Sequence, residues 1–313
     1  MAIIGIGHSD ATFRDLQRIG VSSCDRYLHV TRKLGIIVIV RDYRMNDRQQ
    51  NELRAITLYT RLCSVPLFEE SENDAEILGT GTLFMVNSQH YLVTAAHVLE
   101  ELIATNRLER IGIPLGGLSA AVSNLGKCNI ETFKISDPFD AAIIRFEQPE
   151  LIGALQIGWH FLSPKDLSSI RADMPNCLVA GYPRVTTRKA GWQLSPKFFC
   201  FVSSLLSEVP EYADEVREGL DIFLKHRENG EELDGGTSEV PNLKGVSGAS
   251  IWGVIPNSGG SVWSAESRLR VIGVQTSCRS GSYIRGKSWE LAARVFRRFD
   301  ERAFEEIEAA LNR

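Results

Sequence analysis

The feature that most constrains the fold is a series of short strand-like segments that begins near residue 77 and continues almost to the C-terminus. Each segment holds a few apolar or β-branched residues, and Gly, Pro or Asn separates it from the next. Residues 79–86, a turn at 87–89 and a returning strand over 90–94 form one expected hairpin. Further strands are expected near residue 135 and over 141–146, 178–180, 198–205, 220–224, 249–254 and 269–275. This pattern predicts an all-β barrel or sandwich, and the 26 glycines fit such a turn-rich chain.

Residues 1–76 precede this pattern and are expected to form an N-terminal extension of mixed strand and helix. An apolar run over 34–40 predicts a buried strand, and apolar residues at helical spacing predict a helix from about residue 47 to 63. The acidic stretch 69–74 indicates a polar linker. A further helix is expected at the C-terminus, over about 288–312, with Ser288 as its N-cap.

Composition argues against several classes of function. The formal net charge of −4 offers no basic field for phosphate backbones, so we expect no nucleic-acid partner. The longest apolar run has seven residues, whereas a membrane-spanning helix needs about 20, so no membrane association is expected. The N-terminus has no cationic start, long apolar stretch or cleavage site, which predicts a cytoplasmic protein. The six cysteines never form Cys-x-x-Cys, and neither His-x-x-x-His nor a phosphate loop occurs, so no metal and no cofactor are expected.

Three short blocks carry the chemistry, in a fixed order along the chain. The first is Thr-Ala-Ala-His ending at His97, the second is Asp-Ala-Ala-Ile-Ile starting at Asp140, and the third is Gly-Val-Ser-Gly around Ser247. A serine hydroxyl is a weak nucleophile at neutral pH unless a neutral imidazole takes its proton. A carboxylate behind that imidazole fixes its tautomer and stabilises the imidazolium. His97, Asp140 and Ser247 are therefore the candidate catalytic residues.

The glycines beside Ser247 indicate a sharply turned loop. Such a turn can direct the amide N–H groups of Gly245 and Ser247 at one point, where a substrate carbonyl becomes an oxyanion. Losing one such donor typically lowers the rate by about 10²–10³-fold, so the loop matters nearly as much as the nucleophile.

Asp137 is the alternative to Asp140 as the acid of the triad, but it precedes a proline and is typical of a turn.

At these residues the sequence resembles the trypsin-like, chymotrypsin-fold serine peptidases, and within them the bacterial stand-alone peptidases. The order His, Asp, Ser is theirs, and so are the three blocks. The resemblance covers residues 77–313 and implies two six-stranded antiparallel β-barrels with the triad between them. Barrel 1 would span about 77–160 and barrel 2 about 170–287, followed by the C-terminal helix. It implies a serine endopeptidase that acts on a protein or peptide substrate.

Departures from the family pattern refine this expectation. The residue before the nucleophile is Val246, where zymogen-activated relatives carry an Asp, so the Ile-Ile-Gly at residues 3–5 has no carboxylate to meet. Pro241 occupies the position that is acidic in trypsin, so cleavage after Arg or Lys does not follow. The strand 273–277 resembles the family's substrate-pairing strand, where a peptide adds as an extra β-strand. The expected substrate-binding residues are Pro241, Gln275, Thr276, Ser277 and Cys278.

The sequence also bears on two other classes of protein. An α/β-hydrolase requires Gly-x-Ser-x-Gly and the order Ser, Asp, His, and the chain has neither. A catalytically silent peptidase fold that binds a protein partner stays open, because sequence does not show whether the oxyanion loop is correctly formed. The extension 1–76 and an acidic hairpin expected over 211–239, with a turn at 228–230, are candidates for restraining the enzyme or docking a regulatory partner. A role in prokaryotic defence or stress response is a family analogy only.

Overall fold

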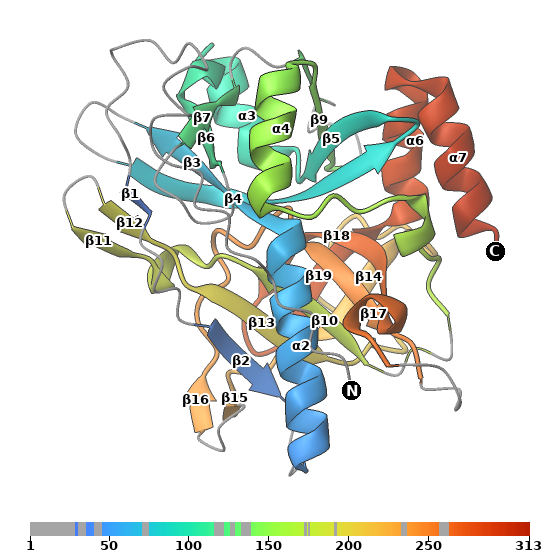
Figure 1. The fold of residues 1–313 in the computed structure, drawn as a ribbon. Helices are drawn as coiled ribbons and strands as arrows, with labels where there is room; N and C mark the ends of the chain where they lie inside the picture. The colour runs from blue at the N-terminus through green and yellow to red at the C-terminus, as the bar shows by residue number, and fades with distance from the viewer. Residues whose placement is uncertain are drawn as a thin grey trace, which may run out of the picture.

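The structure is a computed structural model, and it describes residues 29–30, 36–40, 46–70, 75–115, 122–125, 129–132, 139–171, 174, 176–190, 193–232, 237–256 and 263–313. The described part of the chain is mostly β-sheet, with helices packed around two large sheets (Figure 1). Strands β1 (His29–Val30), β12 (Gln193–Ser195) and β11 (Arg188–Ala190) form a separate small sheet.

The first large sheet has seven strands in the order β7-β6-β3-β4-β5-β9-β8. Its strands are β3 (Ser64–Glu70), β4 (Ala75–Val86), β5 (Gln89–Thr94), β6 (Ile111–Pro114), β7 (Val122–Asn124), β8 (Asn129–Thr132) and β9 (Ala142–Phe146). All its pairings are antiparallel. Helices α3 (His97–Ala104) and α4 (Pro149–Gly158) contribute apolar residues to its core.

The second large sheet has nine strands in the order β14-β19-β18-β17-β10-β13-β2-β15-β16. Its strands are β2 (Ile36–Val40), β10 (Cys177–Gly181), β13 (Phe198–Ser203), β14 (Asp221–Lys225), β15 (Asn229–Glu232), β16 (Thr237–Glu239), β17 (Ser250–Val254), β18 (Leu269–Arg279) and β19 (Tyr283–Ser288). An isolated bridge between Leu205 and Leu224 also brings the chain after β13 against β14.

The two sheets share one circular strand order. Strands β3, β4, β5, β6, β8 and β9 of the first sheet correspond in chain order to β10, β13, β14, β17, β18 and β19 of the second. If the strands of each set are numbered one to six along the chain, neighbouring strands in both sheets follow the circular order 1-2-3-6-5-4. The first sheet lacks the pairing between strands five and four, and the second lacks the pairing between strands two and three. The structure therefore confirms a mostly β-sheet chain, but the described pairings leave each sheet open at one place and do not form two closed six-stranded barrels.

The N-terminal extension differs in part from the expectation. Helix α2 (Asp47–Cys63) and strand β2 confirm the predicted helix and strand, and a capping box at Asn46 begins the helix. Strand β3, however, is an integral strand of the first sheet, and it includes two residues assigned to the polar linker, Glu69 and Glu70. Two charged residues are compatible with this strand because β3 is only half-buried at its end, where the carboxylates reach water.

Two further predictions need correction. The C-terminal segment is not one helix but two, α6 (Trp289–Phe299) and α7 (Glu301–Leu311), because Asp300 leaves the helical conformation and caps α7 by accepting from Ala303 N. The expected turn at 228–230 is instead the start of β15, which pairs with β16 and with β2. Among the described helices, none is long and apolar enough to cross a membrane.

Candidate active site

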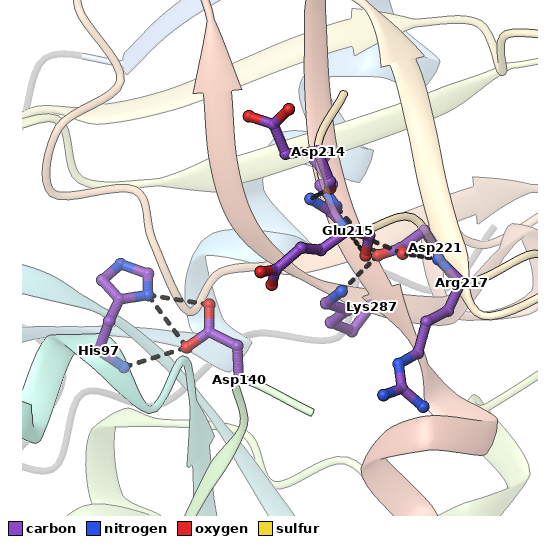
Figure 2. Close-up of polar contacts among 8 residues, drawn as sticks. His97, Asp140, Asp214, Glu215, Arg217, Asp221 and Lys287 are labelled. Atoms are coloured by element: carbon purple, nitrogen blue, oxygen red, sulfur yellow. Dashed lines mark hydrogen bonds and ion pairs between the residues drawn. The ribbon is translucent and has the colours of Figure 1, made fainter. Parts of the chain in front are cut away.

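Strand pairing brings His97 and Asp140 together. His97 begins α3 just beyond the end of β5, and Asp140 lies just before β9, whose Ala142 pairs with Thr94 of β5. His97 Nδ1 lies 3.1 Å from Asp140 Oδ1 and 3.0 Å from Oδ2, and the His97 backbone amide donates to Oδ1 at 3.1 Å (Figure 2). The carboxylate therefore fixes both the ring and the backbone of His97, while Nε2 of the ring makes no hydrogen bond to any described residue.

Asp140 has a left-handed backbone, with φ of +38°. Asp and Asn adopt this region more readily than most residues, and backbone strain of this kind is often found at functional sites. The alternative acid, Asp137, lies outside the described residues, so only Asp140 is seen to contact the imidazole.

The environment of His97 favours its charged form. Burial opposes a positive charge on the ring, but the hydrogen bond and the charge of Asp140 outweigh it, with a smaller contribution from Glu100, so the pKa of His97 is raised. The side chain of His97 keeps 37% of its surface exposed, which leaves the ring accessible to a substrate. A histidine with a raised pKa is a stronger base, as proton transfer from a hydroxyl requires.

Ser247 lies on a tightly turned segment, residues 243–249, which we call the Ser247 loop. Gly245 and Gly248 have φ of +96° and +89°, a region that favours glycine. Two short turns shape the loop, since Val246 N donates to Leu243 O at 2.9 Å and Ala249 N donates to Val246 O at 2.9 Å. The two glycines flank Val246 and Ser247 and give the sharp turn that the sequence predicted.

Thr80 of β4 attaches the Ser247 loop to the first sheet. Its backbone amide donates to Ser247 O at 2.9 Å, and its hydroxyl donates to Gly245 O at 2.9 Å. The same hydroxyl accepts from Tyr182 N at 3.1 Å, and Thr80 is fully buried. One threonine thus holds the Ser247 loop and the residue that follows β10 against β4.

Close packing places the Ser247 loop beside the His97 segment. A Cβ added to Gly248 would lie 2.0 Å from Thr94 Oγ1 and 2.8 Å from Ala95 N. A Cβ added to Gly79 would lie 2.6 Å from Val98 Cγ1 and 2.9 Å from Ser247 O. Gly248 therefore packs against the residues just before His97, and Gly79 of β4 lies between Val98 and the Ser247 carbonyl.

The two amides predicted to bind an oxyanion, those of Gly245 and Ser247, donate to no acceptor within the described part of the chain. No hydrogen bond joins the Ser247 hydroxyl to His97 in these residues either. Catalytic hydrogen bonds are often long in enzymes without substrate and shorten when it binds.

The predicted substrate strand lies beside the Ser247 loop. Gly248 N donates to Gln275 O, and Gln275 N donates to Ala249 O, each at 2.8 Å. Strand β17 pairs with β18 only as far as Val274, so the edge of β18 from Thr276 onward has no partner strand on that side among the described residues. Ser277 and Cys278 are exposed there, and Pro241 is half-buried just before the Ser247 loop.

Sequence reasoning missed Gly79 and Thr80, which it took for ordinary strand residues. The signal that could have found them is the run Gly-Thr-Gly-Thr over residues 79–82, because closely spaced glycines in a strand mark a close backbone approach. It also missed Asp221, whose buried carboxylate binds Arg285 and Lys287.

Asp221 anchors the segment 204–220 to the second sheet (Figure 2). Its carboxylate accepts from Arg285 Nη2 at 2.9 Å and from Lys287 Nζ at 2.5 Å. Arg285 also donates to the carbonyl oxygens of Asp214 and Glu215, at 2.8 and 2.9 Å. Burial opposes the charge of Asp221, but its hydrogen bonds to Arg285, Lys287 and the Arg217 amide prevail and lower its pKa.

The described residues contain no group of three or more His, Cys, Asp or Glu side chains that could hold a metal ion. Of the six cysteines, four fall within the described chain and none of these is disulfide-bonded: Cys63, Cys177 and Cys200 are buried and Cys278 is exposed.

Comparison with known proteins leaves the family unassigned. No protein-family model matches the chain, and no curated protein matches it. Among solved structures, the inactive form of the Rv3671c protease is similar over 83% of this chain and 100% of its own, at 11% identity and a TM-score of 0.46. A chain from a study of the coupled folding and binding of the Sesbania mosaic virus VPg protein is similar over 73% of this chain and 86% of its own, at 14% identity and a TM-score of 0.41.

Proposed function

We propose that this chain is a serine endopeptidase that hydrolyses peptide bonds through an acyl-enzyme, with His97, Asp140 and Ser247 as its triad. The observation that carries the proposal is the double contact of Asp140 with His97, next to a serine loop shaped by two glycines of positive φ. The repeated circular strand order supports the finer architecture of two six-stranded barrels, with this site between them.

In the proposed reaction, His97 Nε2 takes the proton of the Ser247 hydroxyl as Oγ attacks the scissile carbonyl carbon. Asp140 holds Nδ1–H and stabilises the imidazolium that forms. The amides of Gly245 and Ser247 donate to the oxyanion. His97 then gives its proton to the leaving amine as the C–N bond breaks. Water deprotonated by His97 hydrolyses the ester and restores Ser247.

A peptide substrate would add as a strand to the free edge of β18 that begins at Thr276. Backbone pairing of this kind gives affinity, and side chains beside the strand give specificity. This placement needs neither a cofactor nor a metal, and it fits a protein substrate with a locally extended segment.

A second candidate function is a catalytically silent peptidase fold that binds a protein partner. The observation that favours it is the lack of a hydrogen bond between Ser247 and His97 in the described residues. In that case the edge of β18 would still bind an extended peptide, but no acyl-enzyme would form.

Hydrolysis of a diverse fluorogenic peptide library by the purified full chain separates the two functions. Ser247→Ala is expected to lower kcat/KM by on the order of 10³-fold or more. Ser250→Ala is the matched control, because Ser250 lies on the same segment but its hydroxyl donates to Thr82 Oγ1. The control should keep its activity, and equal activity of wild type and Ser247→Ala would remove the assignment.

A further inference from the structure

Gln275 is buried beside the Ser247 loop and carries an unpartnered amide oxygen. The residue is 1% exposed. Its side-chain Nε2 donates to Ser277 O at 3.0 Å, which fixes which end of the amide is the acceptor. Oε1 has no hydrogen-bond partner among the described residues. A buried acceptor without a donor is unfavourable, so its presence calls for an explanation.

The side chain of Gln275 lies on the face of β18 that packs against the apolar cluster flanking Ser247. Gln275 pairs directly with Gly286 of β19, and residues opposite each other in an antiparallel pair project to the same face. A Cβ on Gly286 would lie 2.2 Å from Ile251 Cδ1, so this face is the one that holds Ile251. Ile251 packs in one apolar cluster with Val246 and Ala249, which stand on either side of Ser247.

The backbone of Gln275 cannot pair with a peptide substrate. Its N–H donates to Ala249 O and its carbonyl accepts from Gly248 N, both at 2.8 Å. Peptide pairing along β18 therefore starts at Thr276, and only the side chain of Gln275 remains to contact a substrate. A peptide whose carbonyl carbon reaches Ser247 would bring the side chain of that same residue next to this apolar face.

We propose that Gln275 Oε1 accepts a hydrogen bond from the substrate side chain that precedes the scissile bond, and that the enzyme prefers an uncharged donor such as glutamine there. This rests on the proposed function. A neutral oxygen in an apolar setting can satisfy an amide or hydroxyl donor without burying a net charge. Lysine or arginine would bring a charge that Gln275 does not neutralise.

The test compares fluorogenic peptides that differ only at the residue before the cleaved bond, using glutamine against its near-isostere methionine and threonine against valine. Wild type should cleave the glutamine peptide about 10- to 100-fold more efficiently than the methionine peptide. Gln275→Met keeps the size of the side chain and removes the acceptor, so it should erase or reverse that ratio. Gln275→Glu should gain cleavage of a peptide with lysine before the cleaved bond, because its carboxylate can neutralise the lysine charge.

Each outcome bears on one claim. Cleavage by wild type without a preference for glutamine and threonine over their apolar partners overturns the role of Gln275 and leaves the peptidase intact. A preference for glutamine that survives in Gln275→Met overturns the role of Gln275 as well. Because the cleavage efficiencies of the two peptides are compared with the same protein sample, partial unfolding of the variant does not change their ratio. No cleavage of any peptide by wild type overturns the proposed function itself.

Discussion

Thr80 and Ser247 lie far apart in the sequence, yet the Thr80 amide donates to the Ser247 carbonyl at 2.9 Å. The Thr80 hydroxyl reaches Gly245 O from the same position. The shape of the Ser247 loop therefore depends on β4 of the first sheet as well as on its own glycines.

Thr80→Val should impair catalysis beyond its effect on folding. The substitution removes a buried hydroxyl that donates to Gly245 O and accepts from Tyr182 N, which costs about 1–3 kcal/mol of unfolding free energy. Because Gly245 also supplies an oxyanion amide in the proposed mechanism, kcat should fall about 10-fold or more. Denaturant melts and kinetics on the same preparations measure both effects.

Thr82→Val is the matched control for that prediction. Thr82 is also buried in β4, but its hydroxyl accepts from Ser250 Oγ rather than contacting Gly245. It should lose comparable stability and keep kcat within a factor of a few. Equal losses of kcat in the two variants would show that Thr80 does not act through the loop.

Gly248→Ala should disrupt the site. A Cβ there would lie 2.0 Å from Thr94 Oγ1 and 2.2 Å from Thr80 O, at a φ of +89°. The expected cost is at least about 2 kcal/mol, with activity lost. Gly153→Ala in α4 is the control, because its Cβ would meet nothing within 4 Å, and it should gain about 0.5–1 kcal/mol. A Gly248→Ala variant with wild-type activity would contradict the packing described here.

The pH dependence of kcat/KM should report the raised pKa of His97. The neutral imidazole is the base, so activity should rise with pH through a midpoint above the ordinary value of 6.5. Asp140→Asn should move that midpoint to lower pH and lower kcat by about 10³–10⁴-fold. Glu100→Gln should move it slightly in the same direction with kcat nearly unchanged, and the shift should shrink in high salt.

Glu101→Gln is the control for the electrostatic effect. Glu101 is exposed and pairs with Arg107 rather than contributing to the charge environment of His97. Its variant should keep the wild-type midpoint. If the pH profile of kcat/KM for Glu100→Gln coincides with that of wild type at low salt, the charge of Glu100 does not raise the pKa of His97.

Asp221→Asn should destabilise the second sheet. The change leaves Arg285 and Lys287, whose side chains are 14% and 8% exposed, without their buried counter-charge. Breaking a buried pair in this way costs roughly 3–5 kcal/mol. Because the pKa of Asp221 is lowered, its contribution is complete above the ordinary Asp pKa and is lost as pH falls through the folded value.

Urea melts from neutral to acidic pH measure this contribution, and Asp214→Asn is the control. Asp214 offers only its backbone carbonyl to Arg285, so its exposed carboxylate should change stability by less than about 0.5 kcal/mol. The difference in unfolding free energy between wild type and Asp221→Asn should become smaller at acidic pH. A difference that stays constant would mean that the charge of Asp221 does not stabilise its contacts with Arg285 and Lys287.

Local pattern predicted much of this fold. Helix α2 was expected at its observed bounds, and β9 and β18 follow apolar runs. The contact of His97 with Asp140 follows from two short blocks, since each fixes a residue at the end of a strand of one sheet. Such features depend on residues close in sequence, which is where pattern and propensity act.

The remainder depends on contacts between distant residues. Nothing near Thr80 predicts that its hydroxyl meets Gly245, and nothing near Asp221 predicts Arg285 and Lys287 as partners. Asp300 interrupts a continuous helical pattern because it caps α7 and accepts from Tyr91 OH at 2.9 Å, an interaction with the first sheet. Tertiary contacts of this kind override local propensity.

Reaction with a fluorophosphonate, followed by mass-spectrometric mapping of the modified residue, tests the central claim most directly. A serine activated by His97 reacts covalently with the probe, and the account predicts one modification per chain, on Ser247. The modification should be absent in Ser247→Ala and strongly slowed in His97→Ala, while Ser250→Ala should react as wild type does. An unmodified wild-type chain, or modification at another serine, would contradict the account.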